Sequence, residues 1–253
     1  MKAVILSAGQ GKRLLPLTAD QPKCAISING RSILEWQVQE LLRVGIKSIH
    51  VVVGFGADKV ETILAHRVKS SSIHTIYNPF FALADNLISC WIARNEMNQD
   101  FVLINGDTLF ETAVLEGLLQ APSAPITLVT DEKSHYDEDD MKVIVRGTQL
   151  VRIGKTLPIE QVTGESIGMI RFQDKGPGLF CSGLDQRIRK AEALKQWYLS
   201  LIDELAKQDH VSTFSIKGLI WAEIDNPSDL EQAERLLKIY EPLSMSPSIS
   251  PQG

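Results

Sequence analysis

Short apolar runs rich in Val and Ile alternate along this chain with amphipathic stretches of helical length. This alternation limits the fold most strongly, because strands that alternate with helices form parallel sheets covered by helices on both faces. The apolar runs predict strands at residues 2–6, 49–53, 73–77, 101–105, 126–130, 142–146, 150–153, 167–172, 213–216 and 220–224. The amphipathic stretches predict helices at residues 32–44, 57–68, 87–97, 112–120, 186–208 and 227–239. We therefore expect an α/β fold of three layers around a Rossmann-like mixed, mainly parallel sheet.

Residues 131–165 interrupt this rhythm. The acidic run 137–140 is followed by two strand-like pieces that meet at a hairpin-like turn, residues 146–149. We interpret this segment as a small β lobe, inserted over the carboxyl edge of the sheet within one domain of residues 1–240. Residues 241–253 are rich in Ser and Pro, a composition that predicts a disordered tail.

Composition narrows the functional classes. A net charge of −5 gives no electrostatic reason to expect nucleic acid as a partner. No apolar run approaches the roughly 20 residues that a membrane helix needs, so we expect no membrane span. Cys24, Cys90 and Cys181 lack metal-ligand spacing, which fits a reducing compartment and a cytoplasmic location. The sequence leaves open whether the chain forms a homo-oligomer.

The first predicted strand runs directly into a glycine-rich turn that carries cations. Gly9 and Gly11 allow backbone N–H groups to approach an anion closely, because glycine has no Cβ. Lys12, Arg13 and the nearby Lys23 would neutralise its charge. These residues predict a polyphosphate site at the carboxyl end of the first strand.

Two familiar phosphate motifs do not account for this turn. The dinucleotide fingerprint needs a third glycine where this chain has Leu14. A P-loop ending occurs at Lys155 and Thr156, but Gln149 replaces its first glycine and Pro158 follows where a helix should begin. The sequence therefore supports neither a dehydrogenase nor a P-loop NTPase.

Three carboxylates follow or lie on predicted strands. Asp107 follows an apolar strand, where ligands bind in open α/β sheets, and carboxylate oxygens suit Mg²⁺. The alternative is a carboxylate that caps the turn or the helix beginning at Thr112. Glu223 and Asp225 lie two residues apart and so share one strand face, which is unfavourable without a cation or solvent between them. An exposed edge strand is the alternative there.

The order Leu-x-Ala-Gly-x-Gly-x-Arg-Leu-x-Pro-Leu-Thr, followed by Pro-Lys, runs from Leu6 to Lys23. It resembles the signature of the GT-A-like nucleotidyltransferases that activate sugar phosphates and related phospho-alcohols with a nucleoside triphosphate. The Asn-Gly-Asp ending at Asp107 resembles the metal-binding motif of that family. The segment from Trp221 to Asp225 resembles its closing acidic motif.

The resemblance implies roles for these residues. Arg13, Lys23 and Asp107 would form the catalytic set, with Arg13 on the β- and γ-phosphates and Lys23 on the α-phosphate or the acceptor phosphate. Asp107, Asp225 and Glu223 would hold Mg²⁺.

The family also implies nucleotide contacts. Backbone groups of Ala8, Gly9 and Gly11, together with Arg13, would bind the nucleotide. Asn86 occurs where family members contact the base, although its position also suits helix capping.

The acceptor would lie near the inserted lobe. The family places a second lysine there against the acceptor phosphate, which points to Lys155. Glu165 and the acidic run 137–140 would help to attract a cationic head group.

The segment Leu83-Ala84-Asp85-Asn86 replaces the Gln-Gly-Thr-Ala type of segment of the hexose-phosphate enzymes. In this respect the chain resembles the cytidylyltransferases that act on phosphocholine or inositol phosphate. We therefore expect a Mg²⁺-dependent enzyme that transfers CMP from CTP to a phospho-alcohol and releases pyrophosphate. The alternatives are a sugar-1-phosphate uridylyl-, thymidylyl- or guanylyltransferase, a non-catalytic nucleotide-sensing module, and an interaction protein.

Overall fold

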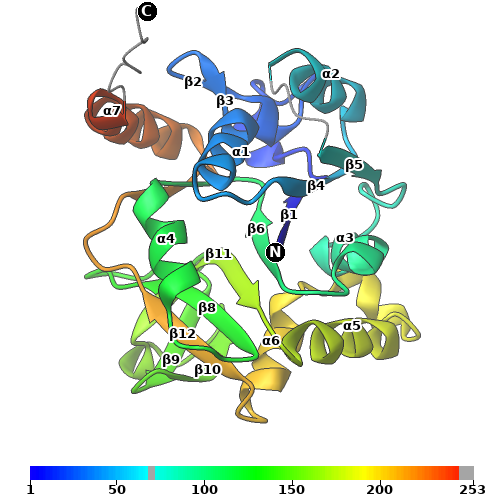
Figure 1. Ribbon diagram of the computed structural model, residues 1–253, viewed down its shortest axis with the longest axis vertical. Coiled ribbons are helices and arrows are strands. Elements are labelled where there is room, and N and C mark those ends of the chain that lie inside the picture. Colours follow the sequence, from blue (N-terminus) through cyan, green and yellow to red (C-terminus); the bar gives the residue numbers. More distant parts are fainter. Residues whose placement is uncertain (68–71, 245–253) are drawn as a thin grey trace, which may run out of the picture.

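A nine-stranded sheet forms the centre of the protein (Figure 1). The computed structural model describes residues 1–67 and 72–244, and all statements about the structure refer to these residues. The strand order is β5 (Ile73–Tyr77), β4 (Ser48–Val53), β1 (Lys2–Ser7), β6 (Phe101–Asn105), β11 (Gly164–Phe172), β8 (Ile126–Asp131), β12 (Val211–Ser215), β10 (Gln149–Gly154) and β9 (Lys142–Arg146). Every strand predicted from the apolar runs is present, and the α/β class is confirmed.

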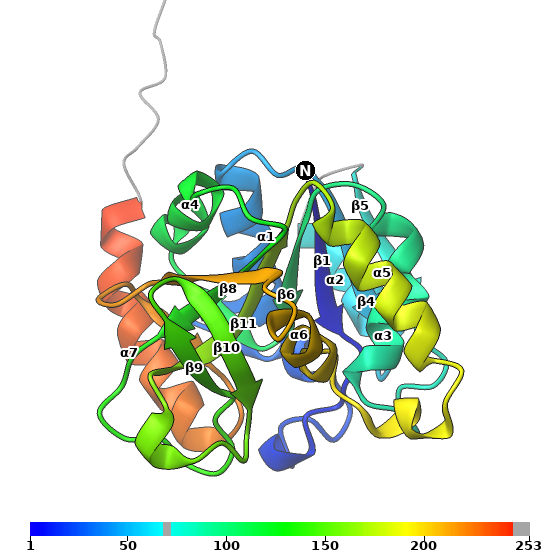
Figure 2. The same cartoon turned by 90° about the horizontal axis from the view of Figure 1, so that it is seen from below.

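The sheet is parallel in one half and mixed in the other. Strands β5, β4, β1 and β6 run parallel to one another, whereas β11 is antiparallel to both β6 and β8. The carboxyl ends of the four parallel strands therefore meet at one edge, where open α/β sheets place their ligands. Strands β9 and β10, from the predicted lobe, form a hairpin at the far end of the same sheet (Figure 2).

Helices cover both faces of this sheet and complete the expected three layers. Apolar side chains of α1 (Ile33–Arg43), α2 (Ala57–Arg67) and α4 (Thr112–Gln120) pack on one face. Those of α3 (Asn86–Ala93), α5 (Gly176–Arg187) and α6 (Leu199–Ala206) pack on the other. Short 3-10 helices connect these elements, at η1 (Lys12–Leu14), η2 (Lys23–Ala25), η3 (Arg94–Glu96), η4 (Ile159–Gln161) and η5 (Ala191–Lys195).

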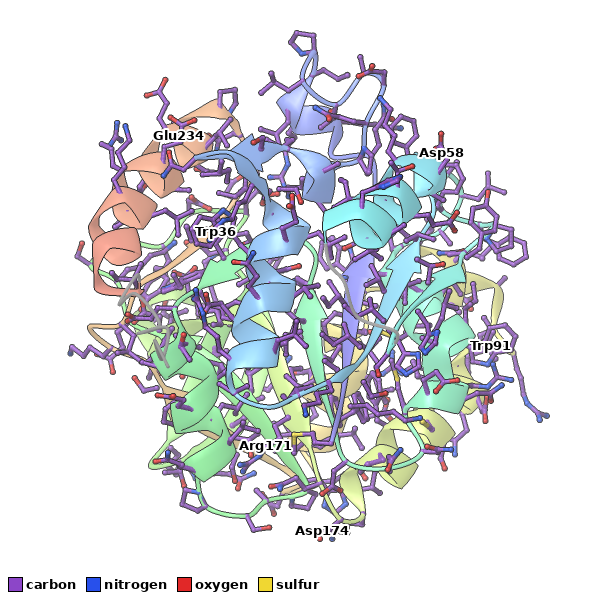
Figure 3. The ribbon with its side chains drawn as sticks, turned by 45° about the horizontal axis from the view of Figure 1, so that its top comes forward. Trp36, Asp58, Trp91, Arg171, Asp174 and Glu234 are labelled. Atoms are coloured by element: carbon purple, nitrogen blue, oxygen red, sulfur yellow. The ribbon has the colours of Figure 1, made fainter. Side chains whose placement is uncertain are left out.

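A third packing unit lies beside α1. Helix α7 (Pro227–Ser244) packs with the small hairpin of β2 (Ser27–Ile28) and β3 (Arg31–Ser32). Trp36 points from α1 into this cluster, and its indole N–H donates to the carbonyl of Ile28 (Figure 3). This packing matters for function because the segment just before α7 carries the closing acidic motif.

Local signals in the sequence fix the ends of these helices. Ser32 and Glu35 form a capping box at the start of α1, and Gly45 adopts a φ of +83° just beyond its end. The side-chain oxygen of Asn226, just before α7, accepts hydrogen bonds from the backbone N–H groups of Ser228 and Asp229 and so caps the helix.

The prediction of one long helix at residues 186–208 is wrong. Two helices, α5 and α6, replace it, and the 3-10 helix η5 lies between them. Helix α5 begins at Gly-Pro-Gly, a sequence typical of a loop, yet Pro177 stands in the first turn, where a missing N–H costs nothing.

The predicted tail is only partly described. Helix α7 continues to Ser244, so residues 241–244 are helical, while residues 245–253 lie outside the described residues. None of the helices in residues 1–67 and 72–244 is both long and apolar enough to cross a bilayer.

Candidate active site

The loop after β1 brings two cations to the carboxyl edge of the sheet. Gly11 adopts a φ of +77°, and a Cβ at this position would lie 2.9 Å from the Lys23 Cβ. Glycine therefore allows the loop to turn while the Lys23 side chain passes close by. A guanidinium nitrogen of Arg13 lies 2.8 Å from a carboxylate oxygen of Asp225, from the opposite end of the chain.

Three carboxylates meet across a short two-stranded sheet. Strand β7 (Thr108–Phe110) pairs antiparallel with β13 (Trp221–Glu223), and this register places Glu223 opposite Thr108. The N–H of Ile224 donates to the carbonyl of Asp107 at 3.1 Å and continues the pairing. Carboxylate oxygens of Asp107, Glu223 and Asp225 consequently lie within 4.8 Å of one another.

The ammonium group of Lys23 lies between two of these carboxylates. It donates to Asp107 at 2.7 Å and to Asp225 at 2.5 Å. Burial by itself lowers the pKa of Lys23, but the two carboxylates outweigh it and raise the pKa above the ordinary lysine value. Lys23 is thus a fixed positive charge that neutralises part of the acidic cluster.

The oxygen atoms of the cluster suit a divalent cation. The Oδ1 atom of Asp107 is buried and has no hydrogen-bond partner among the described residues. Desolvation within the site, followed by the charges of Asp107 and Asp225, raises the pKa of Glu223 to about 8. Three carboxyl groups that lie this close together offer oxygen ligands of the kind that Mg²⁺ prefers, and a bound cation would favour the ionised form of Glu223.

A cavity of about 810 Å³ extends from this cluster, and we call it the larger cavity. All the residues predicted to bind nucleotide line it, and so do all the predicted catalytic and metal-binding residues except Glu223: Ala8, Gly9, Gly11, Arg13, Asn86, Lys23, Asp107 and Asp225. Residues far apart in the sequence therefore meet around one space.

Asn86 lines the larger cavity, but its carbonyl oxygen is engaged. It accepts a hydrogen bond from the backbone N–H of Tyr198 at 3.0 Å. Its amide nitrogen is the group left to face a ligand.

A second cavity of about 560 Å³ adjoins the first, and we call it the acidic cavity. Arg13 and Asp225 line both cavities, whereas Glu165 and Glu223 line this one alone. Its carboxylates far outnumber its two cationic side chains, Arg13 and Lys133, and are contributed by Asp131, Asp137, Asp139, Asp140, Glu165, Glu223, Asp225 and Asp229.

Glu165 is buried in the wall of the acidic cavity. Lys133 bridges it to Asp140, with nitrogen–oxygen distances of 3.0 Å to Glu165 and 2.6 Å to Asp140. Burial raises the pKa of Glu165 to about 7, even though the neighbouring Lys133 acts to lower it.

A chain of charges connects the two cavities. Asp139 lies 2.9 Å from Arg13 and 3.2 Å from the ammonium of Lys155. The same ammonium lies 4.8 Å from the ring centre of Trp197, which lines the larger cavity. Lys155 itself lines neither cavity and lies at their junction.

Sequence reasoning missed several residues of the larger cavity. Phe55 and Phe81 place their rings edge to face, with centroids 6.4 Å apart. Asn78 donates from its amide to the hydroxyl of Ser89 at 3.0 Å, and both side chains are buried. The signal for Phe55 and Asn78 was their place just after β4 and β5, at the binding edge of a parallel sheet.

Comparison with known proteins agrees with this geometry. A family profile described as nucleotidyl transferase matches residues 2–130. A bifunctional IPC transferase and DIPP synthase from Aquifex aeolicus is 27% identical over 93% of this chain and 51% of its own length. The CMP-5'-(3-aminopropyl)phosphonate synthase from Streptomyces rubellomurinus is 36% identical over 92% of this chain and 38% of its own length. The chain thus spans about half or less of these two relatives.

Other relatives match along their whole length. The choline-phosphate cytidylyltransferase from Streptococcus pneumoniae is 22% identical over 94% of this chain and 99% of its own. The solved inositol-1-phosphate CTP transferase from T. maritima has a TM-score of 0.80 at 22% identity and covers 94% of both chains. The latter likeness shows a shared fold. The profile match over the first half of the chain shows that it belongs to the nucleotidyl transferase family.

Proposed function

We propose that this protein is a Mg²⁺-dependent cytidylyltransferase that transfers CMP from CTP to a small phospho-alcohol and releases pyrophosphate. One observation carries the proposal: Arg13 and Lys23, from the glycine-rich turn and the segment after it, contact the carboxylates of Asp107 and Asp225 in the wall of one cavity. Cations for the phosphates and oxygen ligands for a metal are the two requirements of phosphoryl-type transfer.

In this reaction an oxygen of the acceptor phosphate attacks the α-phosphorus of CTP, and the bond to the pyrophosphate oxygen breaks. Arg13 would neutralise the β- and γ-phosphates, which leave as pyrophosphate. Lys23 would exchange its carboxylate partners for the α-phosphate or the acceptor phosphate. Asp107, Asp225 and Glu223 would hold Mg²⁺, which supplies further positive charge against the phosphate oxygens.

The nucleotide would occupy the larger cavity. Backbone groups of Ala8, Gly9 and Gly11 line it beside β1, and Asn86 lines it beside α3. We assign these residues to the ribose, phosphates and base, with the amide nitrogen of Asn86 facing a pyrimidine carbonyl. The choice of CTP is supported by the names of the Streptomyces, pneumococcal and T. maritima relatives.

The acceptor would occupy the acidic cavity, under the loop and hairpin of residues 131–165. Lys155 and Arg13 lie at its junction with the larger cavity, where the acceptor phosphate must meet the α-phosphorus. The excess of carboxylates, Glu165 included, favours an acceptor with a positively charged head group such as phosphocholine. The ring of an inositol phosphate carries no such charge, so hydrogen bonds alone would hold it.

A pyrophosphate-release screen tests the proposal. CTP, UTP, dTTP, GTP and ATP are each combined with phosphocholine, inositol phosphate and hexose 1-phosphates in the presence of Mg²⁺. We expect release with CTP and phosphocholine, and none from the Asp107→Ala variant prepared in the same way. Release only with UTP, dTTP or GTP and a hexose phosphate would instead identify a sugar-phosphate enzyme. CTP binding without release for any acceptor would favour a nucleotide-sensing module.

A further inference from the structure

A polar side chain occupies an apolar position in α1. Gln37 lies on the same helix face as Leu34 and Leu41, three residues before it and four after it, and both leucines belong to the buried core. The Gln37 residue is 1% exposed. A buried amide costs free energy unless hydrogen bonds compensate for its lost hydration, so its partners show what it does.

Both partners of Gln37 belong to the turn that carries Asp107. Its amide nitrogen donates to the carbonyl of Asn105 at 2.7 Å and to the carbonyl of Thr108 at 2.8 Å. These two carbonyls flank Gly106 and Asp107, so one amide group holds the turn at both ends. Its own oxygen has no hydrogen-bond partner among the described residues.

A second buried side chain holds the same turn from the opposite face of the sheet. The hydroxyl of Tyr198, just before α6, donates to the side-chain oxygen of Asn105 at 3.0 Å. Gly168 leaves room for the Asn105 amide, because a Cβ there would lie 2.4 Å from its nitrogen. The helical layers on the two faces of the sheet thus each contribute one side chain that holds the turn after β6 (Figures 1 and 2).

We propose that Gln37 is a positioning residue that aims the Asp107 carboxylate at the metal, and that Tyr198 supports it from the other face. The inference rests on the proposed role of Asp107 as a metal ligand. Gly106 lets the turn approach β1 closely, because a Cβ there would lie 2.6 Å from the carbonyl oxygen of Leu6, to which the Gly106 N–H donates. The contacts of Gln37 and Tyr198 on the two flanks add to this one and hold Asp107 near Glu223 and Asp225.

The test measures Mn²⁺ binding to the free protein, by electron paramagnetic resonance of the unbound ion, without nucleotide or turnover. Gln37→Met removes both donors and keeps a side chain of similar length. We expect it to weaken Mn²⁺ binding by about 10- to 100-fold, as for other side chains that orient metal ligands. In assays the Mg²⁺ concentration for half-maximal activity should rise by a similar factor, while kcat at saturating Mg²⁺ recovers most of its value.

Ser32→Ala is the matched control. It removes the N-cap of the same helix, lowers the melting temperature, and leaves the Asp107 turn untouched. Its Mn²⁺ affinity should therefore equal that of the unsubstituted protein. If Ser32→Ala weakened Mn²⁺ binding as much as Gln37→Met at equal loss of stability, general loosening of α1 would explain the effect and the proposal would fail.

Two further variants make the outcome decisive. Tyr198→Phe removes only one hydroxyl and should also weaken Mn²⁺ binding. If Gln37→Met does not fold, this variant alone tests whether fixing the Asp107 turn matters for metal binding. Unchanged Mn²⁺ affinity in the folded variants at Gln37 and Tyr198, with binding lost in Asp107→Ala, would refute the positioning role alone. Unchanged affinity in Asp107→Ala would refute the metal site itself.

Discussion

Replacing Lys23 by methionine tests the electrostatics of the site without any substrate. The Lys23 ammonium is the cation in contact with both Asp107 and Asp225. Methionine keeps much of the aliphatic chain but removes the charge. The three carboxylates, Glu223 included, then lie within 4.8 Å of one another with less positive charge between them.

The loss of stability in Lys23→Met can be estimated from this geometry. Removing one partner of a fully buried ion pair costs about 3–5 kcal/mol. The side chains here are 12% exposed for Lys23 and 22% for each aspartate, so solvent screens part of the repulsion. We expect a loss of about 2–3 kcal/mol in the free energy of unfolding. For a chain of this size, that corresponds to a fall of about 4–12 °C in melting temperature.

A divalent cation should reverse most of this loss. Mg²⁺ at about 100 times its dissociation constant contributes about 2.7 kcal/mol to the folded state. Because Lys23 no longer competes for Asp107 and Asp225, the stabilisation by Mg²⁺ should be larger in Lys23→Met than in the unsubstituted protein. The assay is thermal unfolding with EDTA and at increasing Mg²⁺ concentrations.

Lys59→Met is the control for this measurement. Lys59 pairs with Asp20 at 3.2 Å on the open surface, where an ion pair contributes about 0–1 kcal/mol. Its melting temperature should barely change and should respond to Mg²⁺ as the unsubstituted protein does. Equal stability of Lys23→Met and the unsubstituted protein in EDTA, or an equal gain from Mg²⁺ in both, would refute the reasoning.

Three further substitutions probe the other parts of the site. Asp107→Ala should abolish pyrophosphate release while circular dichroism stays unchanged, because it removes a proposed metal ligand rather than core packing; normal turnover in a folded variant would disprove the metal assignment. Asp139→Asn should remove the ion pairs of Asp139 with Arg13 and Lys155 and so leave these cations available to phosphate. CTP binding, measured by calorimetry, should become about two- to fivefold tighter, the effect expected from the free energy of one exposed ion pair. Weaker CTP binding would contradict this. Glu165→Gln should raise the free energy of unfolding by about 3 kcal/mol at pH 8 and by about 1 kcal/mol at pH 5. Glutamine stabilises the protein at high pH because the pKa of Glu165 is raised to about 7 in the folded state. Ionisation of Glu165 therefore destabilises the folded state as the pH rises from the ordinary glutamate pKa towards 7. Urea titrations measure this, and an equal gain in stability at both pH values would show that the pKa of the carboxyl is not raised.

The parts of the fold that were predictable are those in which local pattern and burial agree. Strand β6, for example, is an apolar run buried on both faces, as expected of a central parallel strand. In helix α5 the local pattern and the burial disagree. Its Gly-Pro-Gly start resembles a loop, and the helix is stabilised by the packing of Phe180 and Leu184 on the sheet. The strand predicted at residues 220–224 is present as β13, but its partner β7 was not predicted, since a strand of three residues carries almost no pattern of its own.

The residues of the candidate site also differ in how far the sequence could predict them. Lys23, Asp107 and Asp225 are chemically conspicuous, and their place after strands or in the family-like motifs made them predictable. Gln37 was not, because a glutamine within a helix normally indicates a solvent-facing position. Asp139 was hidden as well, because within an acidic loop no spacing rule distinguishes the carboxylate that contacts both Arg13 and Lys155.

The ion pairs of the site also imply that its ligands affect one another. Lys23 and Asp225 are 202 residues apart in the sequence, and their contact joins the two ends of the site. Under the proposed function, a metal ion that takes Asp107 and Asp225 frees Lys23 for phosphate, and a triphosphate that takes Lys23 frees the aspartates for metal. Each ligand therefore removes the competitor of the other, so the two should bind with positive and reciprocal coupling.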